Sequence, residues 1–294
     1  MQYFVMHSLR LGVFFALLAA FLNSTSGIFS KILLEQHAAS DIVFAKCLLA
    51  FFLSSIWILF SGEWRKTKWN WTHTAKVSLC ALFGIGGTYI FEIMAYNTLS
   101  APVVVLCLMG ASTVTTLFIG HYWLKERLKF LTFLSLLIIL AGLYLMTPHT
   151  ADIGDYAAVI YALISGFCYG MFLLLAKRFD LPATLVTICL LMGFGSFYLY
   201  PLTSGNLIYI FTTANALIFL LPLAILPTIL GYFYTTKALH YAPANTVQFF
   251  QVSEPIFSAI LAFFILQEFM VPHEYVGATL IIGALLLYSY ASRR

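Results

Sequence analysis

Long apolar stretches constrain this chain more than any other feature of its sequence. Windows of helical length with few charged side chains recur along all 294 residues. A helix needs about 20 apolar residues to cross the hydrocarbon core of a bilayer. The windows predict about ten membrane-spanning helices, at residues 9–29, 42–60, 77–95, 103–123, 130–147, 156–176, 183–200, 216–236, 247–266 and 275–290.

The composition supports an all-α membrane protein. Hydrophobic residues make up 62% of the chain and charged residues 9%, which leaves too little polar surface to cover a soluble globule. A transmembrane β-barrel would instead show alternating segments of about ten residues. The first apolar stretch is long enough to span, so we expect it to be an integral helix and not a cleaved signal peptide.

Basic residues predict the orientation in the membrane. Under a ten-span count Lys31 alone falls on the opposite side, and Lys46 lies inside a span. The basic side of such proteins is cytoplasmic, so both termini are predicted to be cytoplasmic, in a plasma (inner) membrane. Because these charges lie in short loops, they do not indicate a nucleic acid partner. The basic residues on the shared side are Arg10, Arg65, Lys66, Lys68, Lys76, Lys125, Arg127, Lys129, Lys177, Arg178, Lys237, Arg293 and Arg294.

Similar segments half a chain apart indicate an internal duplication. Residues 16–31 align with residues 162–177, and Leu124-Lys125-Glu126 corresponds to Leu266-Gln267-Glu268. A repeat with an odd number of spans must enter the membrane upside down in its second copy. The sequence therefore predicts two inverted five-helix repeats, at residues 1–148 and 149–294, around a central cavity.

The ends of the two halves resemble a known family. Each half ends with a helix, a Leu-x-Glu motif and a last span that bears glycine, and Ser253-Glu254-Pro255 looks like a Glu-Pro step in the ninth span. This pattern is similar to EamA-type members of the drug/metabolite transporter superfamily. The resemblance implies secondary transport by alternating access between the two halves. Thr113 stands where the family often has a proline in the fourth span.

Charged residues inside apolar spans are the main candidates for function, because burying a charge in a membrane is costly. Glu254 lies near the middle of the ninth span, beside Pro255, which would remove a helix hydrogen bond. It either binds an amine or a proton, or only shapes the helix. Lys46 and Glu92 share a depth, so they either form an ion pair at an outer gate or extend separately to the interface.

Polar residues at helical spacing accompany these charges. Side chains three, four and seven positions apart project from one face of a helix. The stripes predict a wall of one central cavity, although a hydroxyl group in a membrane helix also commonly bridges to a neighbouring helix. The candidate residues besides Glu254, Glu92 and Lys46 are Gln251, Gln248, Ser258, Tyr89, Tyr96, Tyr232, Ser112, Thr113 and Asn23.

The predicted lining suits a zwitterionic or cationic metabolite, such as an amino acid or an amine. A phosphorylated solute would need several buried Arg or Lys side chains, and only Lys46 is available. A proton on Glu254 or Glu92 is the candidate coupling ion. We expect no cofactor and no metal, with the lipid bilayer as the surroundings of a monomer or a homodimer.

Two other classes of function remain open at this level. An intramembrane enzyme could use His121, His240 or the acidic residues, although they do not form a catalytic cluster in the sequence. A non-transporting structural or sensory subunit is the third class. The sequence contains no Walker-type phosphate-binding motif, so direct ATP drive would require a partner.

Overall fold

The computed structural model describes residues 2–62, 70–96, 101–126, 129–145, 156–204, 207–212, 214–267 and 271–293. Over these ranges the chain consists of helices, turns and short connections, without a strand. Several predicted features lie outside the described residues. They are the boundary between residues 148 and 149, Glu268 of the second Leu-x-Glu motif, the side chain of Tyr96, and the basic residues Arg65, Lys66, Lys68, Arg127 and Arg294.

The first half of the chain forms one long helix and four shorter spans. The third of these spans is not regular, because a π-helical segment, η1, joins its two α-helices. The elements are α1 (Gln2–Leu34), α2 (Ala39–Ser61), α4 (Trp71–Ala81), η1 (Leu82–Gly87), α5 (Thr88–Tyr96), α6 (Ala101–Leu124) and α7 (Phe130–Leu145).

The second half repeats this order with more interruptions. A second π-helical segment, η3, lies inside the span that corresponds to the third. The elements are α8 (Tyr156–Arg178), α9 (Leu185–Leu199), the 3₁₀ turn η2 (Tyr200–Leu202), α10 (Leu207–Thr212), α11 (Ala214–Leu223), η3 (Ala224–Gly231), α12 (Tyr232–Tyr241), α13 (Ala244–Gln251), α14 (Glu254–Leu266) and α15 (Pro272–Arg293).

These elements account for each of the predicted spans. Among the described residues, eight helical stretches are long and apolar enough to cross a membrane, and two shorter apolar helices, Phe130–Leu145 and Tyr275–Ala291, complete the set. Each predicted window falls on one of them. The chain is an all-α membrane protein, as the sequence predicts.

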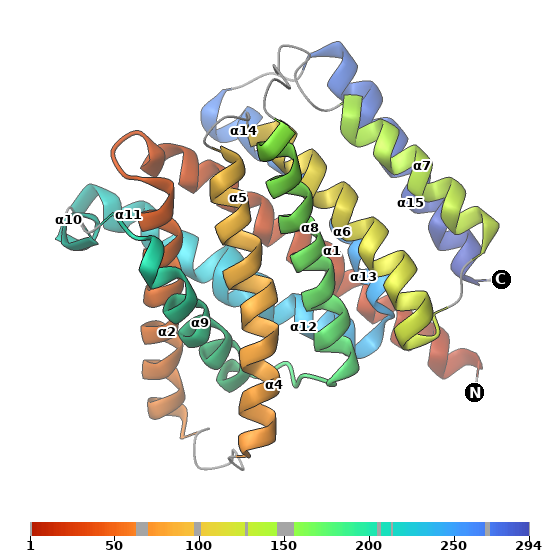
Figure 1. Cartoon of the computed structure of the whole chain (residues 1–294). Coiled ribbons are helices and arrows are strands. Elements are labelled where there is room, and N and C mark those ends of the chain that lie inside the picture. Colours follow the sequence, from red (N-terminus) through yellow and green to blue (C-terminus); the bar gives the residue numbers. More distant parts are fainter. Residues whose placement is uncertain are drawn as a thin grey trace.

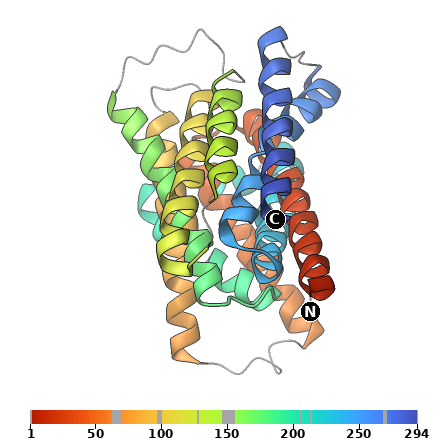
Figure 2. The same ribbon diagram turned by 90° about the vertical axis from the view of Figure 1, so that its right-hand side faces the viewer.

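Helices of the first half pack mainly on helices of the second half. Helix α2 packs on α9, α6 on α8, and α7 on α15, while α1 lies against η3, α12, α13 and α14. Figure 1 shows α7 and α15 side by side along one edge of the bundle, with α2 and α9 towards the opposite edge. In the perpendicular view of Figure 2, most helices follow the long direction of the bundle. The centre therefore lies between the two halves.

Glycines allow the closest of these contacts. A Cβ atom on Gly166 of α8 would lie 2.3 Å from the carbonyl oxygen of Leu108, and one on Gly170 would lie 2.8 Å from Thr115. A Cβ atom on Gly142 of α7 would likewise lie 2.8 Å from the backbone of Gly277 in α15. Small residues let membrane helices approach this closely.

Candidate functional site

Lys46 lies in the middle of the bundle. The side chain comes from α2 and is 5% exposed. Its Nζ lies 4.2 Å from the centre of the Tyr89 ring in α5. The negative face of an aromatic ring attracts a cation, which offsets part of the cost of burial. The Lys46 ammonium therefore stays inside the bundle and does not extend along its helix to the interface.

Two carboxylates share this region with Lys46. Glu92 lies one turn after Tyr89 in α5, and Glu254 begins α14. Both are close enough to Lys46 to interact with it electrostatically, and they also interact with each other. The fold thus brings together one basic and two acidic side chains from three helices that are far apart in sequence. The specific Lys46–Glu92 ion pair remains a prediction.

The backbone around Glu254 differs from the expected single helix with a proline in its middle. Helix α13 ends at Gln251, and a new helix, α14, begins at Glu254 with Pro255 in its first turn. Proline is well accommodated there, because the first turn of a helix has no partner for its N–H groups. A carboxylate in this turn also interacts favourably with the helix dipole. By contrast, α6, which has Thr113 in place of a proline, is continuous.

Glutamine and tyrosine side chains surround the charges. Gln251 donates a hydrogen bond to Thr235 at 2.9 Å and accepts one from the hydroxyl group of Tyr169 at 3.2 Å. Tyr232 donates a 2.7 Å hydrogen bond to the carbonyl oxygen of Gly84, which belongs to the π-helical segment of the other half. These bonds join α8, α12, α13 and η1 around the centre.

Gln248 forms a second polar group, between α13 and α6. Its Nε2 donates to the hydroxyl oxygens of Ser112 at 2.6 Å and Thr113 at 3.3 Å. Both hydroxyl groups donate their own hydrogen to the carbonyl oxygen of Met109, so towards Gln248 they can only accept. This fixes the orientation of the amide. Its Oε1 is buried and has no hydrogen-bond partner among the described residues.

The remaining predicted residues lie around this centre at different distances. Asn23 of α1 hydrogen-bonds Glu254, and its side chain lies against the backbone of Gly231. Ser258 follows Glu254 by one turn in α14 and faces Gly27 of α1. Tyr96 is the last residue of α5. The sequence thus identified most of the cluster, but not its pairing.

Two hollows of the described structure lie away from the central charges. One, of about 440 Å³, lies among α6, α7 and α8, and another, of about 650 Å³, lies between α2 and α9. Apolar side chains line most of both surfaces, and neither includes the central charges. The central cavity remains a prediction. The described residues also contain no group of three His, Cys, Asp or Glu side chains suited to a metal ion.

Comparison with known proteins gives a consistent result over nearly the whole chain. The sequence profile of the EamA-like transporter family matches residues 10–147 and, separately, residues 156–290. An uncharacterized transporter of Clostridium kluyveri is 24% identical, over 96% of this chain and 94% of that protein. An S-adenosylmethionine uptake transporter of Rickettsia prowazekii is 23% identical, over 96% of this chain and 94% of that protein.

A solved structure shares the fold. A crystal structure superposes on this chain with a TM-score of 0.78, and the match covers 96% of this chain and 99% of the chain in the crystal. The two sequences are 14% identical, so the likeness concerns the fold alone. The two separate profile matches agree with the division into similar halves.

Proposed function

Because the chain belongs to the EamA-like transporter family, with both halves matching it, we propose that it carries a small zwitterionic or cationic metabolite by alternating access. The protein is an integral multi-pass membrane transporter and not an enzyme. In the proposal, the two inverted five-helix repeats rock about the central polar cluster. This cluster faces each side of the membrane in turn.

The observation that carries the proposal is the group of the buried Lys46 and the partly buried Glu92 and Glu254. One basic and two acidic side chains leave an excess of one negative charge when all three are ionised. A solute with a net charge of +1 would neutralise this excess. A zwitterion would leave it in place, but could pair its cationic group with a carboxylate and its own carboxylate with Lys46. A phosphorylated anion would meet two carboxylates and a single ammonium group.

Polar neighbours would supply the directional contacts. Gln251 and Tyr169 join the cluster from α13 and α8, and Gln248 offers a buried carbonyl oxygen for which the described residues supply no donor. An N–H group of the solute would match the Gln248 oxygen, and the two carboxylates would accept further N–H groups. Asn23, Tyr89, Tyr232, Ser112, Thr113 and Ser258 complete the proposed lining, together with Tyr96.

The name of one relative fits this solute class. S-adenosylmethionine, which the Rickettsia prowazekii protein is named for taking up, combines an amino-acid group with a sulfonium cation. In the proposal a proton on Glu254 or Glu92 is the coupling ion, because buried carboxylates in transporters commonly relay protons. The protein is further proposed to act in a plasma membrane, with both termini in the cytoplasm, as a monomer or homodimer.

The test is ligand binding followed by flux. Purified wild type and Glu254→Gln are heated with amino acids, polyamines, S-adenosylmethionine, nucleosides and sugar phosphates, because a bound ligand raises the unfolding temperature. The proposal expects an amino-acid-like or cationic probe to stabilise wild type, and the variant to lose this effect. The probe that binds is then measured for uptake into liposomes.

Other results would lead to different conclusions. Stabilisation by sugar phosphates, with no response to any amine, would contradict the proposed solute class. Binding without uptake into liposomes would favour a non-transporting membrane subunit. If Glu254→Gln retains the stabilisation, Glu254 does not contact the solute, and the binding residues are sought around Lys46 and Glu92.

A further inference from the structure

The start of α13 has no cap of its own. The residue before the helix is Pro243, whose side chain offers no hydrogen-bond acceptor. The first N–H groups of any helix lack partners within the helix and are usually satisfied by a nearby Ser, Thr, Asp or Asn. Here the local sequence provides none, so the acceptor must come from another part of the fold.

Glu126, from the other half of the chain, supplies this cap. Its Oε1 accepts a 2.7 Å hydrogen bond from the N–H of Ala244, and its Oε2 accepts a 3.1 Å bond from the N–H of Asn245. Both carboxylate oxygens are thus directed at the positive end of α13. This glutamate is the last residue of the Leu-x-Glu motif of the first half, 118 residues earlier in the chain.

The local fold holds Glu126 in place for this contact. After α6 ends, Lys125 adopts a positive φ of 55° and turns the chain back. The N–H of Glu126 then bonds the carbonyl oxygen of Gly120 at 3.2 Å, and His121 Nδ1 contacts the Glu126 carbonyl oxygen at 2.8 Å. Gly120 also leaves the space next to the carboxylate open. Contacts of both its N–H group and its carbonyl oxygen therefore hold the backbone of Glu126 in the position from which its side chain reaches α13.

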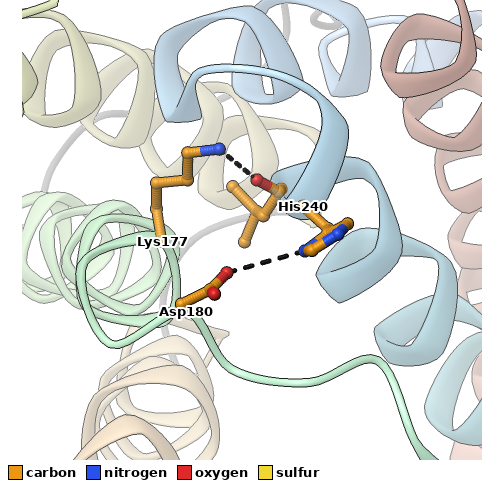
Figure 3. A network of polar contacts seen from close by, with 4 residues as sticks. Lys177, Asp180 and His240 are labelled. Atoms are coloured by element: carbon orange, nitrogen blue, oxygen red, sulfur yellow. Dashed lines mark hydrogen bonds and ion pairs between the residues drawn. The ribbon is translucent and has the colours of Figure 1, made fainter. Parts of the chain in front are cut away.

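Charged side chains also hold the end of the preceding helix. We name residues 239–245, where α12 ends and α13 begins, the α12–α13 corner. Figure 3 shows Lys177 of α8 donating to the carbonyl oxygen of Leu239, and Asp180 facing His240 at 3.5 Å. Lys177 also attracts Glu126 electrostatically. Lys177 from α8 and Glu126 from the end of α6 therefore hold the corner, whereas the Asp180 and His240 side chains are 82% and 59% exposed, so their contact adds little.

The corner leads directly into the proposed site. Helix α13, which Glu126 caps, carries Gln248 and Gln251, and Gln248 makes the second polar contact with α6. Glu126 and Gln248 therefore make polar contacts at two points along the interface between α6 of the first half and α13 of the second. Separating the halves along this interface would require the cap to break.

We propose that Glu126 is a positioning residue that latches α13 to α6 and closes this end of the bundle, and that the latch opens once in each transport cycle. The proposal rests on the alternating access of the proposed function. Burial raises the pKa of the Glu126 carboxyl, while the N–H groups of Asn245 and Ala244 and the Lys177 ammonium lower it. The carboxylate gives up hydration to form the cap. This cost offsets part of the free energy that the cap contributes, so the contact can open and close.

Thiol labelling tests the latch without a substrate. The five native cysteines are replaced, and Thr116, which is fully buried in α6 between Thr113 and Glu126, is changed to cysteine as a reporter. An impermeant thiol reagent is applied to vesicles of both orientations. In Glu126→Gln the side chain keeps its size but turns an amide donor towards one of the N–H groups. We expect labelling of the reporter from the corner side to rise about fivefold. This is the increase in the open state that corresponds to the free energy of one lost helix cap.

Asp180→Asn is the matched control. It removes a carboxylate at the same end, and asparagine tolerates the positive φ of 47° at this position. Asp180 contacts His240 but does not cap α13, so the reporter should label as in the parent protein. A second reporter, Ser258→Cys, lies beyond Glu254 and should become less reactive from the opposite side when Glu126 is changed.

The labelling experiment has further outcomes that decide whether the latch exists. Unchanged labelling of the Thr116→Cys reporter in folded Glu126→Gln, or an equal rise in Asp180→Asn, would overturn the latch. Should Glu126→Gln fail to fold, Glu126→Asp is measured instead, and its shorter carboxylate should give an intermediate rise. A lack of substrate uptake would overturn the proposed function but would leave the labelling pattern intact, so the two failures are distinguishable.

Discussion

The charged residues at the centre of this protein interact with one another. Lys46 is almost completely buried over the ring of Tyr89, and its field reaches both Glu92 and Glu254. Removing one partner of a buried charge pair leaves the other uncompensated, which usually costs more than the pair itself contributes. The charges should therefore be tested as a group and not one at a time.

Charge reversal tests the predicted Lys46–Glu92 pair. Lys46→Glu would place three carboxylates together, and Glu92→Lys would place two ammonium groups beside a single carboxylate, so each should reduce uptake at least roughly tenfold. The double variant restores the original set of charges and should recover uptake to within a few-fold of wild type. Uptake is measured in liposomes with equal amounts of folded protein. A double variant no better than the singles would show that the two side chains act separately.

Irregular elements place these residues, and hydropathy does not reveal them. The π-helical segments η1 and η3 occupy corresponding positions in the two halves, and Tyr89 and Tyr232 follow them within two residues. Such segments alter the direction in which later side chains project, and they are frequent at functional sites. The break between α13 and α14 has the same effect on Glu254. The helical periodicity placed these residues on shared helix faces, but it could not identify these breaks in the helices.

Glycine substitutions test the packing of the elements. Gly166→Ala should lower the unfolding temperature by several degrees, because its Cβ atom would meet the backbone of α6 at 2.3 Å. Gly283→Ala in α15 is the control, since nothing lies within 4 Å of its Cβ position. Alanine is favoured over glycine inside a helix by about 0.5–1 kcal/mol, so this variant should be unchanged or slightly more stable. Thermal unfolding in detergent measures both, and equal losses would show that the α6–α8 contact is not tight.

At the scale of the whole molecule, each half completes the other. Helix α1 lies against the eighth and ninth spans, α8 lies against the third and fourth, and the α13 start depends on Glu126. Neither half encloses the central charges by itself, because Lys46 and Glu92 come from the first half and Glu254 from the second. A relative movement of the halves would therefore change access to the charges from both sides at once.

The proposed proton coupling is tested on the whole assembly. In liposomes with a pH gradient, uptake by wild type should be faster than without the gradient, because a carboxylate that binds a proton on one side releases it on the other. Glu254→Gln cannot carry the proton and should lose this stimulation, whether or not exchange persists. Glu35→Gln, an exposed carboxylate in the turn after α1, is the control and should respond as wild type. Full stimulation in Glu254→Gln would exclude Glu254 as the proton carrier.

The sequence by itself determined the class of the protein and the positions of its spans. Apolar length and the duplication are local or periodic properties, so residues 9–29 or 156–176 could be recognised without any knowledge of their neighbours. The polar stripes also identified the residues that meet at the centre, because helical spacing fixes which side chains share a face.

Only the tertiary structure decided how these residues pair. Whether Lys46 packs on Tyr89, and which acceptor satisfies the start of α13, depends on helices that are distant in sequence. Pro243 indicates that α13 begins without a local side-chain cap, but no neighbouring residue indicates that Glu126 is the partner. Such contacts follow from the relative placement of whole helices, which the packing of many side chains sets together, and no local pattern in the sequence encodes that placement.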